Sequence, residues 1–137
     1  MKLRIVVATD DGETIFPGHP GDGKKFIVYE LKRSGEWKPV RELDNEARDM
    51  EEKNVHGSSA KMKRVLNLIG DVDIVLSRRN SPNLMRMAKE TTIQPVLVMN
   101  VEKISDGIEK IVENFDDLEE IVSRRKEGDR FEVMKLA

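Results

Sequence analysis

The chain contains no cysteine, so it forms no disulfide bond and offers neither a thiol nucleophile nor a thiolate metal ligand. It also lacks any apolar run near the roughly 20 residues that a membrane-spanning helix needs. Its formal net charge of -2 gives no general attraction to nucleic acid or to an anionic membrane surface. These absences exclude thiol chemistry and argue against nucleic-acid and membrane partners.

What is present suits one globular domain. The 137 residues are enough for a real hydrophobic core and few for two domains, so we expect a single domain over residues 1–137. The first apolar strand pattern begins next to Lys2, which leaves no room for a signal peptide. We therefore expect a cytoplasmic protein.

Residues 56–83 contain the clearest pattern in the chain. Apolar side chains recur there at helical spacing: Met62, Val65, Leu66 and Ile69. Gly70 is suited to end this helix in the left-handed conformation, and the short apolar run 74–76 predicts an inner strand. Ser81 before Pro82 then predicts the start of a second helix. A strand between two helices is half of a parallel crossover unit.

The remaining pattern predicts strands over residues 3–9, 26–31, 37–43 and 95–99, and helices over 82–90, 105–114 and from a capping box at Asp116 onward. Pro39 makes the third strand an expected edge strand. Residues 123–137 are expected to be a helix end and a tail, with residues 131–133 either a short strand or frayed.

This order predicts an α/β fold. An antiparallel meander followed by right-handed βαβ crossovers gives a mixed five-stranded sheet with helices on its faces, which is the ribonuclease H-like layout. The alternative is a doubly wound parallel sheet, which the helix-free start of the chain disfavours.

In that layout the loops 10–25, 44–57 and 78–83 share one edge of the sheet, where ligands of open α/β sheets bind. This edge collects both histidines, His19 and His56, and the expected starts of two helices. It also collects five basic residues: Lys24, Lys25, Lys61, Arg78 and Arg79. Helix starts and cations attract anions, and imidazoles bind soft metals. The edge therefore predicts a site for an anionic, metal-containing ligand.

We assign no catalytic residue. The candidate cofactor-binding residues are His19, His56, Arg78, Arg79, Ser81, Asn83 and Asp10, with His19 and His56 also as candidate metal ligands. A histidine in a Gly/Pro loop and a pair of arginines are also typical of a solvated surface, and that interpretation stays open.

Four segments resemble a known family. They are the opening run 5–12, the Gly/His loop before 26–29, the strand 72–76 leading to Ser81-Pro82-Asn83, and a closing strand and helix. Together they resemble the dinitrogenase iron–molybdenum cofactor biosynthesis proteins, the NifX/NafY-like domains also found at the carboxyl end of NifB, over about residues 3–122. The family usually has Gly-Pro-Asn and His-Phe-Gly-Arg where this chain has Ser-Pro-Asn and His-Pro-Gly-Asp, so His19 is the loop residue that still matches.

The resemblance implies a non-catalytic protein that binds or carries an iron–molybdenum or other iron–sulfur cofactor without a covalent link. The implied partners are that anionic metal–sulfur cofactor and a cofactor-biosynthesis or acceptor protein, and we expect a monomer or a weak dimer. A metal-dependent nuclease is disfavoured, because its carboxylates would have to converge around two metal ions. A regulatory or assembly module that binds a protein partner without metal stays open as the alternative.

Overall fold

The computed structural model describes residues 2–50 and 59–137. Its centre is a six-stranded sheet in the order β3-β2-β1-β4-β5-β6. The strands are β1 (Lys2–Thr9), β2 (Lys25–Lys32), β3 (Trp37–Asp44), β4 (Ile74–Ser77), β5 (Gln94–Leu97) and β6 (Met134–Lys135). The helices of the described chain are the short 3-10 helix η1 (Pro20–Asp22) and the α-helices α1 (Ser59–Ile69), α2 (Pro82–Glu90), α3 (Ile104–Glu113) and α4 (Phe115–Lys126).

The pairing confirms the predicted meander and crossovers. Strands β1, β2 and β3 pair antiparallel, whereas β4 pairs parallel with both β1 and β5. The expected count of five strands was wrong. Residues 134–135 form β6, which runs parallel to β5, and the Leu136 amide donates to the Leu97 carbonyl at 2.9 Å. This tail satisfies backbone groups that would otherwise leave β5 as an open edge. The ribonuclease H-like assignment stays a prediction.

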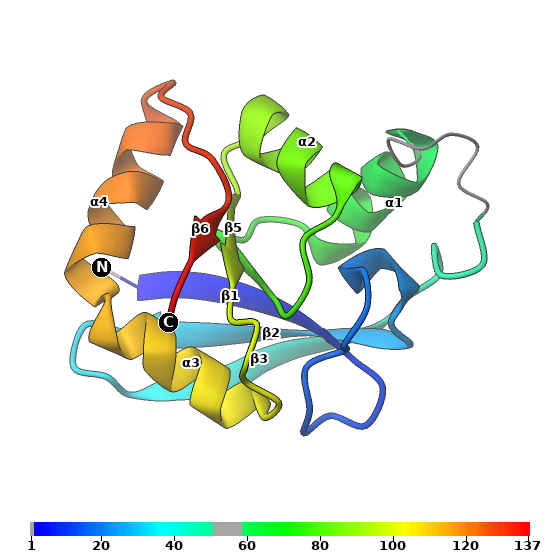
Figure 1. Ribbon diagram of the computed structural model, residues 1–137, viewed down its shortest axis with the longest axis horizontal. Helices are drawn as coiled ribbons and strands as arrows, with labels where there is room; N and C mark the ends of the chain where they lie inside the picture. Colours follow the sequence, from blue (N-terminus) through cyan, green and yellow to red (C-terminus); the bar gives the residue numbers. More distant parts are fainter. Residues whose placement is uncertain (1, 51–58) are drawn as a thin grey trace.

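The helices cover the sheet as two separate layers (Figure 1). Helices α1 and α2 pack on one face, where the buried apolar residues include Val6, Phe26, Val28, Met62, Val65, Val75, Leu84 and Met87. Helices α3 and α4 pack on the other, where they include Ile5, Val7, Tyr29, Leu76, Ile108, Ile111, Leu118 and Val122. The central strands are thus covered on both sides, which is why they are almost continuously apolar. No helix in the described part of the chain is both long and apolar enough to span a bilayer.

Most helix ends match their sequence signals. The Ser81 hydroxyl accepts a hydrogen bond from the Leu84 amide at 3.1 Å and caps α2, as predicted. Gly70 has φ +68° and follows α1, also as predicted. The predicted helix start at a capping box on Asp116 was wrong. Helix α4 begins earlier, at Phe115, because that aromatic side chain packs into the core and the chain turns directly out of α3.

Two side chains of α2 and α4 are notable for their burial. Met85 is 46% exposed, whereas Met87 packs into the core. Arg125, in the last turn of α4, is completely buried. Its guanidinium donates to five neutral acceptors at 2.7–3.3 Å: the carbonyls of Ala88, Thr91, Thr92 and Phe131 and the side-chain oxygen of Gln94. Arg125 therefore ties α4 to the end of α2 and to the carboxyl-terminal tail.

Candidate functional site

A small cavity of about 40 Å³ lies on the α1/α2 face, next to η1 and the start of α2. Its polar lining consists of His19, Lys61, Ser81 and Asn83. Three of these are predicted cofactor-binding residues, and Lys61 is one of the predicted cations of the edge. The rest of the lining is apolar and includes Val6, Phe26, Met62, Val65, Leu84 and Met87. Three segments that lie far apart in the sequence therefore bring polar groups to one hollow.

His19 is held in place by the short helix that follows it. The Asp22 amide donates to the His19 carbonyl at 2.9 Å, and Pro20 occupies the first helical position. Asn45, which follows β3, then fixes the turn, because its side-chain amide donates to the carbonyls of Gly21 and Gly23 at 2.8 and 2.9 Å. Nothing in the sequence pattern marked Asn45, since a clamp between distant loops has no local signature.

Lys61 is the buried cation of the site. Its side chain is only 3% exposed, and its ammonium lies 2.5 Å from a carboxylate oxygen of Asp22, which is 46% exposed. The ammonium also donates to the Arg48 carbonyl at 3.4 Å. A side chain at Gly21 would place its Cβ 3.3 Å from the Lys61 Cε atom, so the close approach of η1 to α1 favours glycine.

Ser81 and Asn83 come from the start of α2. Ser81 is 5% exposed, and its hydroxyl is occupied by the helix cap. The Asn83 side-chain oxygen accepts a hydrogen bond from Arg86 at 3.1 Å. Their arrangement places the positive end of the α2 dipole at the cavity, which favours negative charge there.

The two arginines after β4 are not part of the cavity lining. Arg78 is half-buried, and its buried Nε atom has no hydrogen-bond partner among the described residues. Arg79 is exposed, and its backbone amide and carbonyl are hydrogen-bonded to the Ser77 hydroxyl at 3.2 and 2.8 Å. Of the pair, Arg78 is thus the one with an unsatisfied donor.

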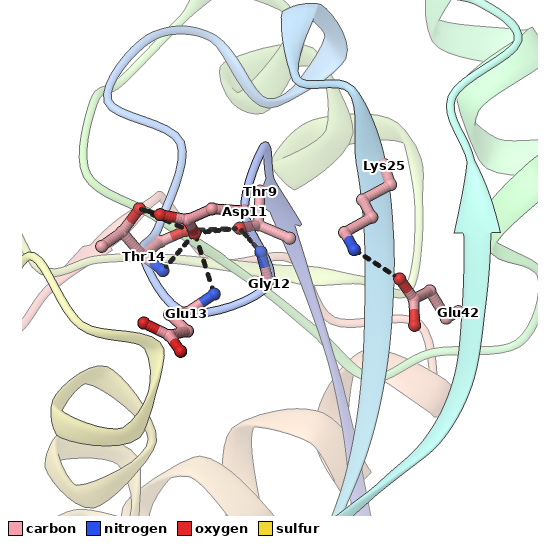
Figure 2. A network of polar contacts seen from close by, with 7 residues as sticks. All are labelled: Thr9, Asp11, Gly12, Glu13, Thr14, Lys25 and Glu42. Atoms are coloured by element: carbon pink, nitrogen blue, oxygen red, sulfur yellow. Dashed lines mark hydrogen bonds and ion pairs between the residues drawn. The ribbon is translucent and has the colours of Figure 1, made fainter.

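The acidic turn after β1 has a structural role (Figure 2). The Asp11 carboxylate accepts from the backbone amides of Glu13 and Thr14 at 2.9 and 2.8 Å and from the Thr14 hydroxyl. These bonds lower the pKa of Asp11 to about 2, the backbone bond to Thr14 contributing most. Asp10, a predicted site residue, is exposed and accepts from the Lys24 amide at 2.9 Å, outside the cavity lining.

The edge is less basic than its sequence suggested. Lys25 lies 2.6 Å from Glu42 on the neighbouring strand, which raises the pKa of the lysine (Figure 2). Lys61 is paired with Asp22, as described above. Lys24 is exposed. Close carboxylates therefore compensate two of the five predicted cations.

The second predicted imidazole, His56, lies outside the described residues. Within residues 2–50 and 59–137, no group of three or more His, Asp or Glu side chains is close enough to hold a metal ion. The carboxylates also lie at opposite ends of the sheet. Asp10 and Asp11 follow β1, whereas Asp73 precedes β4 and binds the Arg4 amide at 2.9 Å and Lys126 at 3.1 Å. The described part thus offers no site of the kind that two-metal nucleases need.

The sequence itself matches a family model, that of the dinitrogenase iron–molybdenum cofactor proteins, over residues 1–114. The chain belongs to this family. The match covers β1 through α3 and includes all the polar residues of the cavity, whereas α4 and β6 lie beyond it. No curated protein and no solved structure shows a significant match. Membership connects the protein with the binding or biosynthesis of the iron–molybdenum cofactor.

Proposed function

We propose that this protein is a non-catalytic carrier of a preassembled, anionic iron–molybdenum or related iron–sulfur cluster, held without a covalent link at the mouth of the His19 cavity. The observation that supports this most directly is the meeting of an imidazole, a buried ammonium and the start of a helix at one hollow. An imidazole binds the metal, and the positive groups favour the negative charge of the cluster.

The small volume of the cavity supports binding of the cluster at its mouth rather than inside it. Ligand pockets usually measure about 300–1,000 Å³, so a cavity of about 40 Å³ has room for little more than water. The cluster therefore lies over the mouth, with the half-buried His19 as the ligand from the described part of the chain. Because no cysteine is present, the cluster arrives already assembled.

The charges around the mouth suit an anion that exchanges. Asp22 is about half exposed, so an incoming anion can replace it as the partner of Lys61. The buried Nε atom of Arg78 offers a further donor near the end of β4. The other predicted ligands, His56, Arg79 and Asp10, remain part of this proposal, as do a cytoplasmic location, a ribonuclease H-like fold and a biosynthetic or acceptor protein as partner.

The test is direct binding. Protein purified without oxygen is incubated with isolated iron–molybdenum cofactor, and bound molybdenum and iron are measured after gel filtration. We expect His19→Ala to weaken retention about tenfold or more, because one metal–imidazole bond is lost. His19→Gln keeps a side chain of similar size and removes the imidazole, so it tests whether the metal–imidazole bond is needed. Lys135→Gln, which lies outside the cavity lining, is the control. Unchanged retention by both His19 variants would show that the site assignment is wrong.

One observation favours a second function, the binding of a protein partner. Strand β3 is one of the two edge strands of the described sheet, and Val40 on it is 42% exposed. Edge strands are templates for pairing with another chain. A pull-down from native lysate that returns one stoichiometric partner and no metal, and that fails with Val40→Lys, would support this function over cluster transport.

A further inference from the structure

A second hollow, of about 350 Å³, lies at the same end of β1 but on the opposite face of the sheet. It is formed by the turn after β1, the paired strands β2 and β3, and the start of α3. Its lining consists of Gly12, Glu13, Thr14, Tyr29, Trp37, Lys103, Ile104 and Ser105. The volume lies at the lower end of the range for small-molecule sites. None of these residues lines the His19 cavity.

The hollow contains the only tryptophan and the only tyrosine of the chain. The rings of Tyr29 and Trp37 meet edge to face, with their centroids 5.6 Å apart and their planes at 78°. They therefore form two walls of one corner. The Trp37 indole N–H donates to Glu109 at 3.1 Å, which fixes the orientation of that ring.

The hydroxyl of Tyr29 is a donor available to a ligand. Tyr29 lines the hollow and is only 5% exposed, and its hydroxyl has no hydrogen-bond partner among the described residues. The hydroxyl is not among the enclosed polar atoms that lack a partner, so water reaches it and a ligand in the hollow would take the place of that water. Burial and the charge of Glu42 raise the pKa of Tyr29, so the hydroxyl keeps its proton at neutral pH and can donate a hydrogen bond.

The lining also carries one charge of each sign. Glu13 and Lys103 are both exposed, and neither has an ion-pair partner in the described part of the chain. Thr14 and Lys103 form an isolated antiparallel bridge, and the Ile104 amide donates to the Glu13 carbonyl at 2.9 Å. The backbone therefore holds the two charged residues beside each other at the rim.

The carboxylates around the hollow are mostly engaged elsewhere. Asp11 accepts the hydrogen bonds of its own turn, Glu42 pairs with Lys25, and Glu109 accepts from Trp37. Lys103 precedes the first turn of α3 without a side-chain cap, so the positive end of that helix dipole lies at the hollow, although Asp106 in the same turn offsets part of it and leaves Lys103 as the main positive group. One side of the hollow thus favours a carboxylate, and Glu13 with the two aromatic rings favours an ammonium group.

From these contacts we propose that the hollow binds a small zwitterion, an amino-acid-like compound with one ammonium and one carboxylate group on an apolar body. Lys103 and the start of α3 bind its carboxylate, Glu13 binds its ammonium, and Tyr29 donates to its polar end. The apolar body packs on Trp37 and Ile104. This site is independent of cluster transport.

The single tryptophan makes the site measurable in the full-length protein. Trp37 emission is followed while glycine, L-valine or L-phenylalanine is added at up to millimolar concentrations. For valine, two matched compounds carry one charge each: isobutylamine and 3-methylbutanoate. We expect a saturable change with at least one zwitterion, and binding of each singly charged analogue about tenfold weaker or more. No saturable response to any zwitterion, or equal binding of one analogue, overturns the proposal.

Variants locate the binding. Lys103→Gln and Glu13→Gln should each weaken it about tenfold, whereas Lys135→Gln removes an equal charge from the surface outside the hollow and should have no effect. Tyr29→Phe should weaken it several-fold and leave the melting temperature unchanged or slightly raised, since the lost hydroxyl has no partner. In ¹⁵N NMR spectra the amides of Gly12 and Ser105 should shift while that of Gly21 does not. Equal effects of Lys103→Gln and Lys135→Gln contradict the assignment.

His19→Ala separates this proposal from the function proposed above. We expect that variant to lose cluster binding and to keep zwitterion binding. If His19→Ala abolished the fluorescence response, the hollow would not be an independent site and the proposal would be wrong.

Discussion

The two helical layers each bury a cation, but the two cations have very different surroundings. On the α1/α2 side, Lys61 has a half-exposed carboxylate, that of Asp22, among its partners. On the α3/α4 side, Arg125 has no carboxylate partner among the residues that the structure describes, and its donors are satisfied by four backbone carbonyls and one side-chain amide oxygen.

This difference separates a structural cation from one that can serve a ligand. Backbone carbonyls at the end of α2 cannot move away from Arg125 without breaking the fold, so that residue is a fixed joint between elements. Asp22 is a half-exposed side chain, so another anion that pairs with Lys61 can take its place. Burial alone therefore does not tell which role a cation has. The mobility and exposure of its partners do.

The largest effect expected is that of Arg125→Met. The change keeps much of the apolar volume but leaves buried carbonyls without donors, so the free energy of unfolding should fall by about 3 kcal/mol or more. Urea unfolding followed by circular dichroism measures it. The neighbouring Arg124→Met is the matched control, with an expected loss below about 1 kcal/mol, because Arg124 is about half exposed. Equal losses for both variants would mean that Arg125 is not the joint described here.

Substitutions of Lys61 or Asp22 should lower the free energy of unfolding less, and the loss should depend on which of the two side chains is removed. Lys61→Met leaves Asp22 free to be hydrated, so we expect a loss of about 1 kcal/mol in unfolding free energy. Asp22→Asn should destabilise more, because it removes a carboxylate from beside a buried ammonium. The effects on cluster binding should differ from those on stability: Lys61→Met should weaken binding, whereas Asp22→Asn should leave it unchanged. Urea unfolding measures the effect on stability, and metal retention after gel filtration measures the effect on cluster binding. If Asp22→Asn weakened cluster binding and Lys61→Met did not, the proposed replacement of Asp22 by the cluster would be wrong.

The smallest effect expected is confined to acid. The pKa of Asp11 is lowered to about 2 from its ordinary 3.8, so its ionised form stabilises the fold above pH 4. That stability should be lost as the pH falls from about 4 to about 2. The difference in stability between the wild type and Asp11→Asn, measured by urea unfolding at several pH values, should therefore shrink over this interval. A difference that stays constant would show that the turn does not depend on the charge.

Much of the fold follows from local patterns. The helical period of residues 62–69, the Ser81-Pro82 start and the positive φ of Gly70 are properties of a few neighbouring residues, and all three predictions were confirmed. The sixth strand could not be predicted in the same way. Residues 134–135 are only two residues long, and they become a strand because β5 offers an open edge.

The candidate site was predicted only in part, because local patterns fix the order of the elements but not the contacts between distant residues. The topology placed His19, Ser81 and Asn83 at one edge, and the structure brings all three to one cavity. The topology could not show that Lys61 would be buried and paired with Asp22, or that Asn45 would clamp the turn, because these contacts join residues 22 to 39 positions apart.

The sequence by itself determined the kinds of element, their order and the exclusion of thiol chemistry, because these depend on residue type and on spacing over a few residues. Only the tertiary structure decided that one cavity is small, that Arg125 is a buried joint, and that the only tryptophan and tyrosine share a hollow with Lys103 and Glu13. Burial and proximity are set by how distant segments pack, and a side chain carries no local signal of the neighbours that packing will bring to it.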